Sequence, residues 1–211
     1  ERGKQAKESE RKILYKKYGP LLFTPGYSVT DPTIGYITRY APSVRENGGL
    51  YTHAGTWAIQ AECIMRDGDR AYEVYKSFNP AQRGLEPDVY ACEPYVTPGN
   101  VDGPDSPFNG RGGWTWYTGS GAWYAVVVLN WMLGLRPVKE GLLMDPVIPK
   151  KWPGFKAKRL FRGATYFVEC VNKNGKGQGV TEVIVDGKKI SGHIVPAFKD
   201  GKEHQVKVTL G

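Results

Sequence analysis

One short segment of the sequence combines a glycine pair with side chains that can bind an anion. Residues 45–53 read RENGGLYTH, which places Arg45, Glu46 and His53 around two glycines, directly before a helical pattern. Paired glycines let the backbone approach a ligand or adopt a positive φ. His53 falls in the first turn of the helix, where N–H groups and the helix dipole favour an anion. The structural alternative is that Arg45 and Glu46 pair at the surface and His53 packs.

A second segment, residues 111–123 (RGGWTWYTGSGAW), offers another helix start of the same kind. Thr118 supplies a hydroxyl at the expected N-cap and Gly119 exposes a backbone N–H, which together suit an anion. Alternatively, Thr118 only caps the helix and the glycines allow close packing. The aromatic side chains between the glycines either belong to the core or stack on sugar rings: Trp114, Trp116 and Tyr117.

A third segment, residues 92–106 (CEPYVTPGNVDGPDS), carries Glu93, Asp102 and Asp105 among prolines and glycines. These acids could accept hydrogen bonds from sugar hydroxyls or form a catalytic carboxylate pair, and the structural alternative is an ordinary surface loop. One weaker hypothesis is therefore an inverting hydrolase that uses Glu46 with Glu93 or Asp102. No HxxE, HExxH or EF-hand spacing occurs, so neither a metal nor a cofactor is predicted. His193 and His204 stand alone in a later region, where surface positions are expected.

The net charge of +8 is carried by the two ends of the chain. Residues 1–20 and 150–211 have net charges of +4 and +8, whereas the middle, which holds the unusual motifs, has −4. A nucleic-acid-binding protein should concentrate Lys and Arg where it contacts its ligand, so no nucleic-acid partner is expected. The longest apolar run, residues 122–129, is far too short to span a membrane, and the charged start is not expected to act as a signal peptide. Three widely spaced cysteines favour a reducing, cytoplasmic location.

The period of the apolar residues predicts helices first and strands later. A helix is expected over 4–18, then an irregular but packed segment to residue 50. Two helices, capped by Thr52 and Asp69 and separated at Gly68, should form an antiparallel αα-hairpin. A further helix over about 119–133 is apolar on nearly every face, which indicates that it is buried in a larger assembly, either an oligomer or a longer protein.

Residues from about 155 onward alternate between apolar and polar, as strands do. Strands are expected over 165–171, 180–185 and 204–210, with a type I′ turn at Asp186-Gly187. The predicted organisation is therefore a helical domain over 1–135, a linker over 136–154 and an antiparallel β domain over 155–211.

Several motifs, taken in order, resemble glycoside hydrolase family 94, which contains inverting disaccharide phosphorylases and cyclic β-1,2-glucan synthases. They are RENGGLYTHAGTW, GDRAYEVYKSFNP, EPYV, GRGGWTWYTGSGAW, LGLRP, LLMDPVIPKKWPGF and FRGATY, within about residues 18–195. The resemblance implies the last part of an (α/α) six-hairpin barrel followed by an antiparallel, jelly-roll-like β domain. It also implies that this chain is part of a much longer polypeptide, whose remainder is its main partner, and that the family commonly forms homodimers.

The resemblance implies phosphorolysis, in which inorganic phosphate cleaves a β-glucoside with inversion to an α-sugar 1-phosphate. Matched to the family's motifs, His53, Thr118 and Gly119 correspond to phosphate-binding positions, and Arg45 and Glu46 to positions near the acceptor sugar. Glu93 lies near the site without a clear role. The general acid of the family, an Asp, lies upstream of these motifs, so the chain alone is expected to be inactive. The tail of a cyclic glucan synthase and a non-catalytic sugar-binding module remain alternatives.

The residue at position 45 departs from the cellobiose type of the family, whose members usually carry Lys there. Arg offers two parallel donors to a carboxylate. The departure therefore suggests an acidic acceptor sugar such as gluconate.

Overall fold

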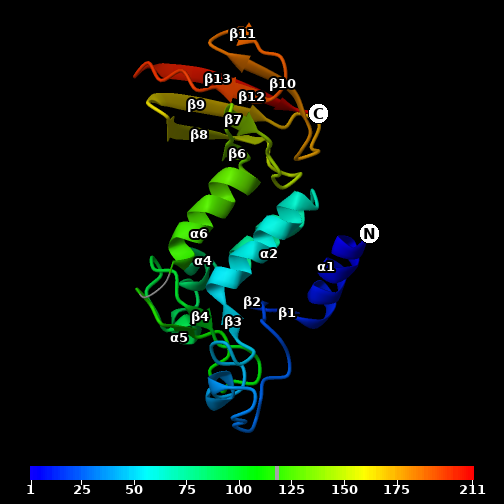
Figure 1. The fold of residues 1–211 in the computed structure, drawn as a ribbon, viewed down its shortest axis with the longest axis vertical. Helices are drawn as coiled ribbons and strands as arrows, with labels where there is room; N and C mark the ends of the chain where they lie inside the picture. The colour runs from blue at the N-terminus through cyan, green and yellow to red at the C-terminus, as the bar shows by residue number, and fades with distance from the viewer. Residues whose placement is uncertain (117–118) are drawn as a thin grey trace. The chain divides into compact units, whose positions relative to one another are not determined.

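The structure, a computed structural model, describes residues 1–116 and 119–211. Its helices are α1 (Arg2–Ile13), α2 (Thr52–Ile64), α3 (Gly68–Phe78), α4 (Pro80–Arg83), α5 (Pro87–Tyr90) and α6 (Ser120–Val127), with a 3-10 turn at Tyr36–Arg39 and a π-helical turn at Val128–Met132. Its strands are β1 (Tyr15–Lys16), β2 (Gly19–Pro20), β3 (Leu50–Tyr51), β4 (Asn100–Val101), β5 (Gly112–Gly113), β6 (Leu135–Pro137), β7 (Gly141–Met144), β8 (Gly154–Phe161), β9 (Ala164–Val171), β10 (Val180–Val185), β11 (Lys188–Lys189), β12 (Ile194–Pro196) and β13 (Glu203–Leu210). The helices therefore come first and the longer strands last, as the sequence predicts (Figure 1).

The internal contacts of the chain divide it into two compact units. One comprises Glu1–Ile59 and Glu73–Ala125, and the other comprises Gln60–Tyr72 and Val126–Gly211. The division into domains over 1–135 and 155–211 stays a prediction for the whole protein.

The first helix is shorter than the sequence predicts. α1 ends at Ile13, and Tyr15 then pairs with Pro20 in the two-stranded hairpin of β1 and β2. Gly19 has a φ of +122°, which a residue with a side chain rarely adopts, so the glycine serves this hairpin rather than a helix end. The prediction of a helix to residue 18 was wrong because Tyr15 and Lys16 pair with Pro20 and Gly19, and this hairpin buries Tyr18.

The predicted αα-hairpin is present as α2 and α3. Gly55, near the start of α2, faces the ring of Phe78 at the end of α3, so closely that a Cβ atom would lie 3.0 Å from the ring. The cap differs from the prediction, because Asp67 rather than Asp69 accepts the N–H of Arg70, at 3.0 Å. Gly68 accordingly belongs to α3 and does not end α2.

The second unit is built on a five-stranded sheet in the order β11-β10-β13-β9-β8 (Figure 1). Its alternating strands bury one face, on which Tyr166, Val168, Val206 and Val208 lie in a common core. Asp186 and Gly187 both have a positive φ, as the predicted type I′ turn requires. One expectation was wrong: β13 pairs with β9 in parallel, because β13 lies between β9 and β10 and runs antiparallel to β10.

Residues 136–154, expected to be a linker, contribute strands to this unit. β6 and β7 form a three-stranded sheet with β12. Leu142, Met144 and Ile148 are almost completely buried in the same core as the five-stranded sheet. The segment thus supplies core side chains to the second unit.

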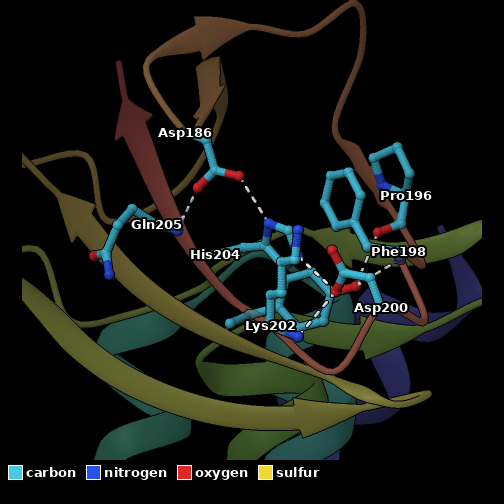
Figure 2. A network of polar contacts seen from close by, with 8 residues as sticks. Asp186, Pro196, Phe198, Asp200, Lys202, His204 and Gln205 are labelled. Atoms are coloured by element: carbon cyan, nitrogen blue, oxygen red, sulfur yellow. Dashed lines mark hydrogen bonds and ion pairs between the residues drawn. The ribbon is translucent and has the colours of Figure 1, made fainter.

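His204 is buried, against the expectation of a surface position. Only 7% of the residue is exposed, and its ring stacks on Phe198 with centroids 4.0 Å apart. Figure 2 shows the ring between the carboxylates of Asp186 and Asp200. His204 is buried because it lies on the same, inward-facing side of β13 as Val206 and Val208.

Candidate functional site

A small antiparallel sheet joins the three segments that the sequence singles out. Leu50 of β3 lies opposite Val101 of β4, which in turn lies opposite Gly112 of β5. Gly112 must be a glycine, because a Cβ atom would lie 2.4 Å from the sulfur of Cys92. The sheet therefore brings residues 45–53, 92–106 and 111–123 together within the first unit.

The RENGG loop is held rigidly from inside. The side chain of Asn47 is fully buried, donates to the carbonyl oxygens of Tyr27 (2.9 Å) and Tyr40 (2.7 Å), and accepts the N–H of Tyr27 (2.8 Å). A Cβ atom on Gly49 would lie 2.8 Å from the carbonyl oxygen of Arg45, which explains the second glycine of the pair. These contacts hold Arg45 at a φ of +52°, in the left-handed region.

Arg45 and Glu46 form a largely buried charged pair. Nε of Arg45 lies 3.4 Å from Oε2 of Glu46, and the two side chains are only 22% and 25% exposed. The Arg45 guanidinium also lies over the ring of Trp114, 3.7 Å from its centroid, and near that of Tyr40. Oε2 of Glu46 is buried and has no hydrogen-bond partner among the described residues. The charged group that lies beside this oxygen is the Arg45 guanidinium.

His53 lies in the first turn of α2, as predicted, with its ring among aromatic side chains. The ring centroids of Trp57 and Trp123 lie 5.2 and 5.4 Å from that of His53. Its Nε2 is buried and has no hydrogen-bond partner within the part of the chain that the structure describes. Leaving a buried polar atom without a partner destabilises a protein by about 1–3 kcal/mol, so such an atom calls for an explanation.

The starts of α2 and α6 lie against each other. Oγ1 of Thr52, the first residue of α2, is 3.1 Å from Oγ of Ser120, the first residue of α6. Gly119 is exposed and its carbonyl accepts the N–H of Trp123. Thr118 lies outside the described residues. The predicted site residues His53 and Gly119 thus directly adjoin a contact between the two helix starts.

Sequence reasoning did not single out Thr52 and Ser120 as a pair, nor Tyr40 as a neighbour of Arg45. Thr52 was expected to cap α2, whereas its hydroxyl donates to the carbonyl oxygens of Pro98 and Gly99. One feature of the sequence could have indicated the pair: Thr52 and Ser120 both lie at expected helix starts and each adjoins a predicted site residue.

Glu93 contacts the exposed side chain of Trp116. Nε1 of Trp116 donates to its carboxylate at 2.9 Å. Its own backbone N–H, and then the Trp116 indole, hold the pKa of Glu93 below its ordinary value. A carboxyl group that favours its ionised form is poorly suited to act as a general acid.

Asp102 has a structural role that explains its burial. It accepts hydrogen bonds from Asn100, Ser106 and Arg111 at 3.1–3.2 Å and is 3% exposed. Burial raises its pKa, while the Arg111 guanidinium acts in the opposite direction. Asp105 similarly accepts the hydroxyl of Ser43 at 3.0 Å. The hypothesis of an inverting hydrolase that uses Glu46 with Glu93 or Asp102 stays a prediction.

The described residues, 1–116 and 119–211, contain neither a metal-binding cluster nor a membrane-spanning helix. No group of three His, Cys, Asp or Glu residues there could hold a metal ion. No helix in those ranges has the length and apolar character needed to cross a membrane.

Comparison with known proteins identifies the family of this chain. The model of the "Glycosyl hydrolase 94 superfamily, catalytic domain" matches residues 1–134. The chain is 34% identical to a solabiose phosphorylase of Paenibacillus borealis, over 100% of this chain and 27% of the relative. It is 36% identical to an N,N'-diacetylchitobiose phosphorylase of Vibrio proteolyticus, over 100% of this chain and 26% of the relative. A cyclic beta-(1,2)-glucan synthase NdvB of Rhizobium meliloti is 38% identical over 77% of this chain and 6% of its own length.

The chain thus spans about a quarter of the length of the two phosphorylases that it matches. The matched residues 1–134 include every residue of the site described above. The chain therefore belongs to the glycosyl hydrolase 94 superfamily.

Proposed function

We propose that this chain is part of a carbohydrate phosphorylase that cleaves a β-glycoside with inorganic phosphate and inverts it to an α-sugar 1-phosphate. Two relatives along its whole length carry names of phosphorylases. Within the chain, the proposal depends most on one observation, the buried Nε2 of His53 without a hydrogen-bond partner among the described residues.

His53 has the chemistry that a phosphate site needs. An imidazole N–H donates to a phosphate oxygen, and the first turn of a helix adds backbone N–H groups and a favourable dipole. The contact between Thr52 and Ser120 brings a second helix start beside the first. We propose that Gly119, and Thr118 next to it, supply the remaining donors of this phosphate site.

In the proposed reaction a phosphate oxygen attacks the anomeric carbon while the glycosidic C–O bond breaks on the opposite face. A carboxylic acid protonates the departing oxygen, and phosphate takes the place of the water that an inverting hydrolase would activate. We propose that this acid belongs to another part of the polypeptide, which also completes an (α/α) barrel around α2, α3 and α6. The β strands after residue 154 would then form the jelly-roll-like layer. The chain alone should accordingly show no turnover.

Arg45 and Glu46 are the proposed contacts to the acceptor sugar. Oε2 of Glu46 can accept a sugar hydroxyl, and the exposed Trp114, over which Arg45 lies, offers a ring face to a pyranose. The guanidinium fork further suits an acceptor that bears a carboxylate, such as gluconate.

A cyclic β-1,2-glucan synthase is the second candidate, supported by the 38% identity to NdvB. It would use the same phosphate and sugar positions on an oligoglucan. The two candidates differ in their substrate, so an assay with both a disaccharide series and β-1,2-glucan chains separates them.

The test uses the full-length protein, a panel of β-linked disaccharides and phosphate, with NMR detection of the anomeric product. We expect phosphate-dependent formation of an α-sugar 1-phosphate. His53→Ala should raise the phosphate KM by about tenfold or more, because a charge-assisted hydrogen bond is lost. The matched control is His193→Ala, which removes an exposed histidine outside the site and should leave the phosphate KM unchanged. Cleavage that proceeds equally well without phosphate would overturn the proposal.

A further inference from the structure

The contact between the helix starts consists of two fully buried hydroxyl groups. Thr52 and Ser120 are both 0% exposed and lie 68 positions apart in the sequence. Thr52 precedes His53 and begins α2, while Ser120 follows Gly119 and begins α6. The two hydroxyls thus connect the two backbone positions on which the proposed phosphate site depends.

The direction of the hydrogen bonds follows from counting protons. A threonine hydroxyl carries one proton, and carbonyl oxygens can only accept. The carbonyl oxygens of Pro98 and Gly99, the latter at 3.0 Å, share the single Thr52 proton, so in the 3.1 Å contact with Ser120 the Thr52 oxygen is the acceptor. Ser120 therefore donates to Thr52, which donates to the backbone before β4.

This chain of hydrogen bonds continues into the aromatic segment. The N–H of Thr52 also donates to the carbonyl oxygen of Gly99, and the N–H of Gly99 donates to the carbonyl oxygens of Gly113 and Trp114. Three segments that carry proposed site residues are therefore connected through Thr52. A shift of either helix start would strain bonds in all three.

We propose that the Thr52–Ser120 hydroxyl pair is a positioning contact that sets the distance between the starts of α2 and α6, and with it the phosphate-binding geometry of His53 and Gly119. This inference rests on the proposed function. Donors must lie about 2.7–3.1 Å from a charged oxygen to stabilise it, and a displacement of about 1 Å can reduce a rate 100-fold. A pair that only stabilised the fold would affect sugar and phosphate binding alike.

The experiment measures separate KM values for phosphate and disaccharide, kcat, and the unfolding temperature of the full-length protein. Thr52→Val removes the hydroxyl and keeps the branched shape, Thr52→Ser keeps the hydroxyl, and Ser120→Ala removes the partner. Ser77→Ala is the matched control, because its buried hydroxyl donates to the carbonyl oxygen of Val74 within α3 and so joins no two helices.

We expect Thr52→Val and Ser120→Ala to raise the phosphate KM about tenfold or more, with the disaccharide KM within about twofold of wild type. Thr52→Ser, which keeps the hydroxyl, should retain the wild-type phosphate KM. The double variant should be no worse than either single variant, because both remove the same contact.

Two results would overturn the positioning role: a folded Ser120→Ala variant with a wild-type phosphate KM, or equal increases in both KM values. If Thr52→Val fails to fold, Ser120→Ala and Thr52→Ser decide the question. A wild-type protein that cleaves sugars without phosphate would instead overturn the proposed function itself, and the inference with it.

Discussion

Nδ1 of His204 lies 2.7 Å from Oδ2 of Asp186. On the other side of the ring, Nε2 lies 3.2 Å from Oδ1 of Asp200 (Figure 2). Both ring nitrogens can donate only when the imidazole is protonated, so this arrangement favours the imidazolium form. The hydrogen bond to Asp186 first, and then that to Asp200, raise the pKa of His204. The three residues join the β10–β11 turn and the loop before β13 to β13 itself.

This network should make the stability of the protein depend on pH. Because folding raises the pKa of His204, the protonated ring stabilises the folded protein fully below a pH of about 6.5. This stabilisation is lost as pH rises through the higher pKa of His204 in the folded state. The pKa of Asp186 is lowered mainly by the hydrogen bond with His204, and that of Asp200 mainly by the N–H of Lys202. The two carboxylates therefore stabilise the folded protein fully above a pH of about 3.8, and this stabilisation is lost as pH falls through their lower pKa values in the folded state.

We therefore expect the unfolding temperature to fall between pH 6.5 and 9 in wild type, and to vary less there in His204→Gln. Thermal unfolding across this range checks the difference, and NMR titration of the ring checks the pKa. A His204 that titrates at or below 6.5 would contradict the assignment.

Tyr166→Phe should reduce the free energy of unfolding by about 1–3 kcal/mol, because it leaves buried polar groups without a partner. The phenol donates to the carbonyl oxygen of Pro196 at 3.0 Å and accepts the N–H of Phe198 at 3.2 Å. Urea unfolding measures the change. Tyr36→Phe, at a side chain that is 60% exposed, is the control and should have little effect. Equal effects of the two substitutions would show that the Tyr166 hydroxyl contributes nothing.

The strands of the second unit were predictable because each alternates over six to eight residues. The predicted ranges 165–171, 180–185 and 204–210 match β9, β10 and β13 within one residue. Their order in the sheet was not predictable, since periodicity describes which face is buried and not which strand lies beside it. In the chain, β10, β11 and β12 lie between the parallel neighbours β9 and β13; β10 is the other neighbour of β13, and β12 belongs to a different sheet.

The site was predictable only where neighbours in sequence are neighbours in space. Arg45 and Glu46 are adjacent residues, so their pairing needed no tertiary information. The contact of Arg45 with Trp114 depends on β3, β4 and β5, each of two residues, which is too short for any alternation to be recognised. The Thr52–Ser120 contact depends on the same sheet together with the packing of two helix starts.

Gly49→Ala should destabilise the first unit by about 1–3 kcal/mol, because overpacking against backbone cannot be relieved by a side-chain rotation. The new Cβ atom would lie 2.8 Å from the carbonyl oxygen and 3.0 Å from the nitrogen of Arg45. Gly3→Ala, in α1, is the control because nothing lies within 4 Å of its Cβ position. Urea unfolding of both variants measures the difference. An unchanged free energy in Gly49→Ala would show that the RENGG loop is more adaptable than its contacts indicate.

Trp116→Phe should raise the pKa of Glu93 toward its ordinary value, because the indole N–H that favours the carboxylate is removed. The backbone N–H of Glu93, the larger cause, remains, so the pKa should recover only partly. Carboxyl NMR titration, with Glu93→Gln to assign the signal, measures the change. A pKa that stays constant or falls would exclude this role of Trp116.

Arg45→Lys should reduce the use of an acidic acceptor sugar far more than that of a neutral one. A guanidinium can donate two parallel hydrogen bonds to a carboxylate, whereas an ammonium group provides a single charged point. In the full-length protein, synthesis from glucose 1-phosphate with gluconate, glucose or sophorose as acceptor measures the preference. We expect kcat/KM for gluconate to fall about tenfold or more in Arg45→Lys, and that for the neutral acceptors to change little. Arg39→Lys, at an exposed arginine in the neighbouring turn, is the control.

A wild-type protein that accepts glucose but not gluconate would rule out the acidic acceptor. Arg45 would then act only to hold Glu46 and to stack on Trp114.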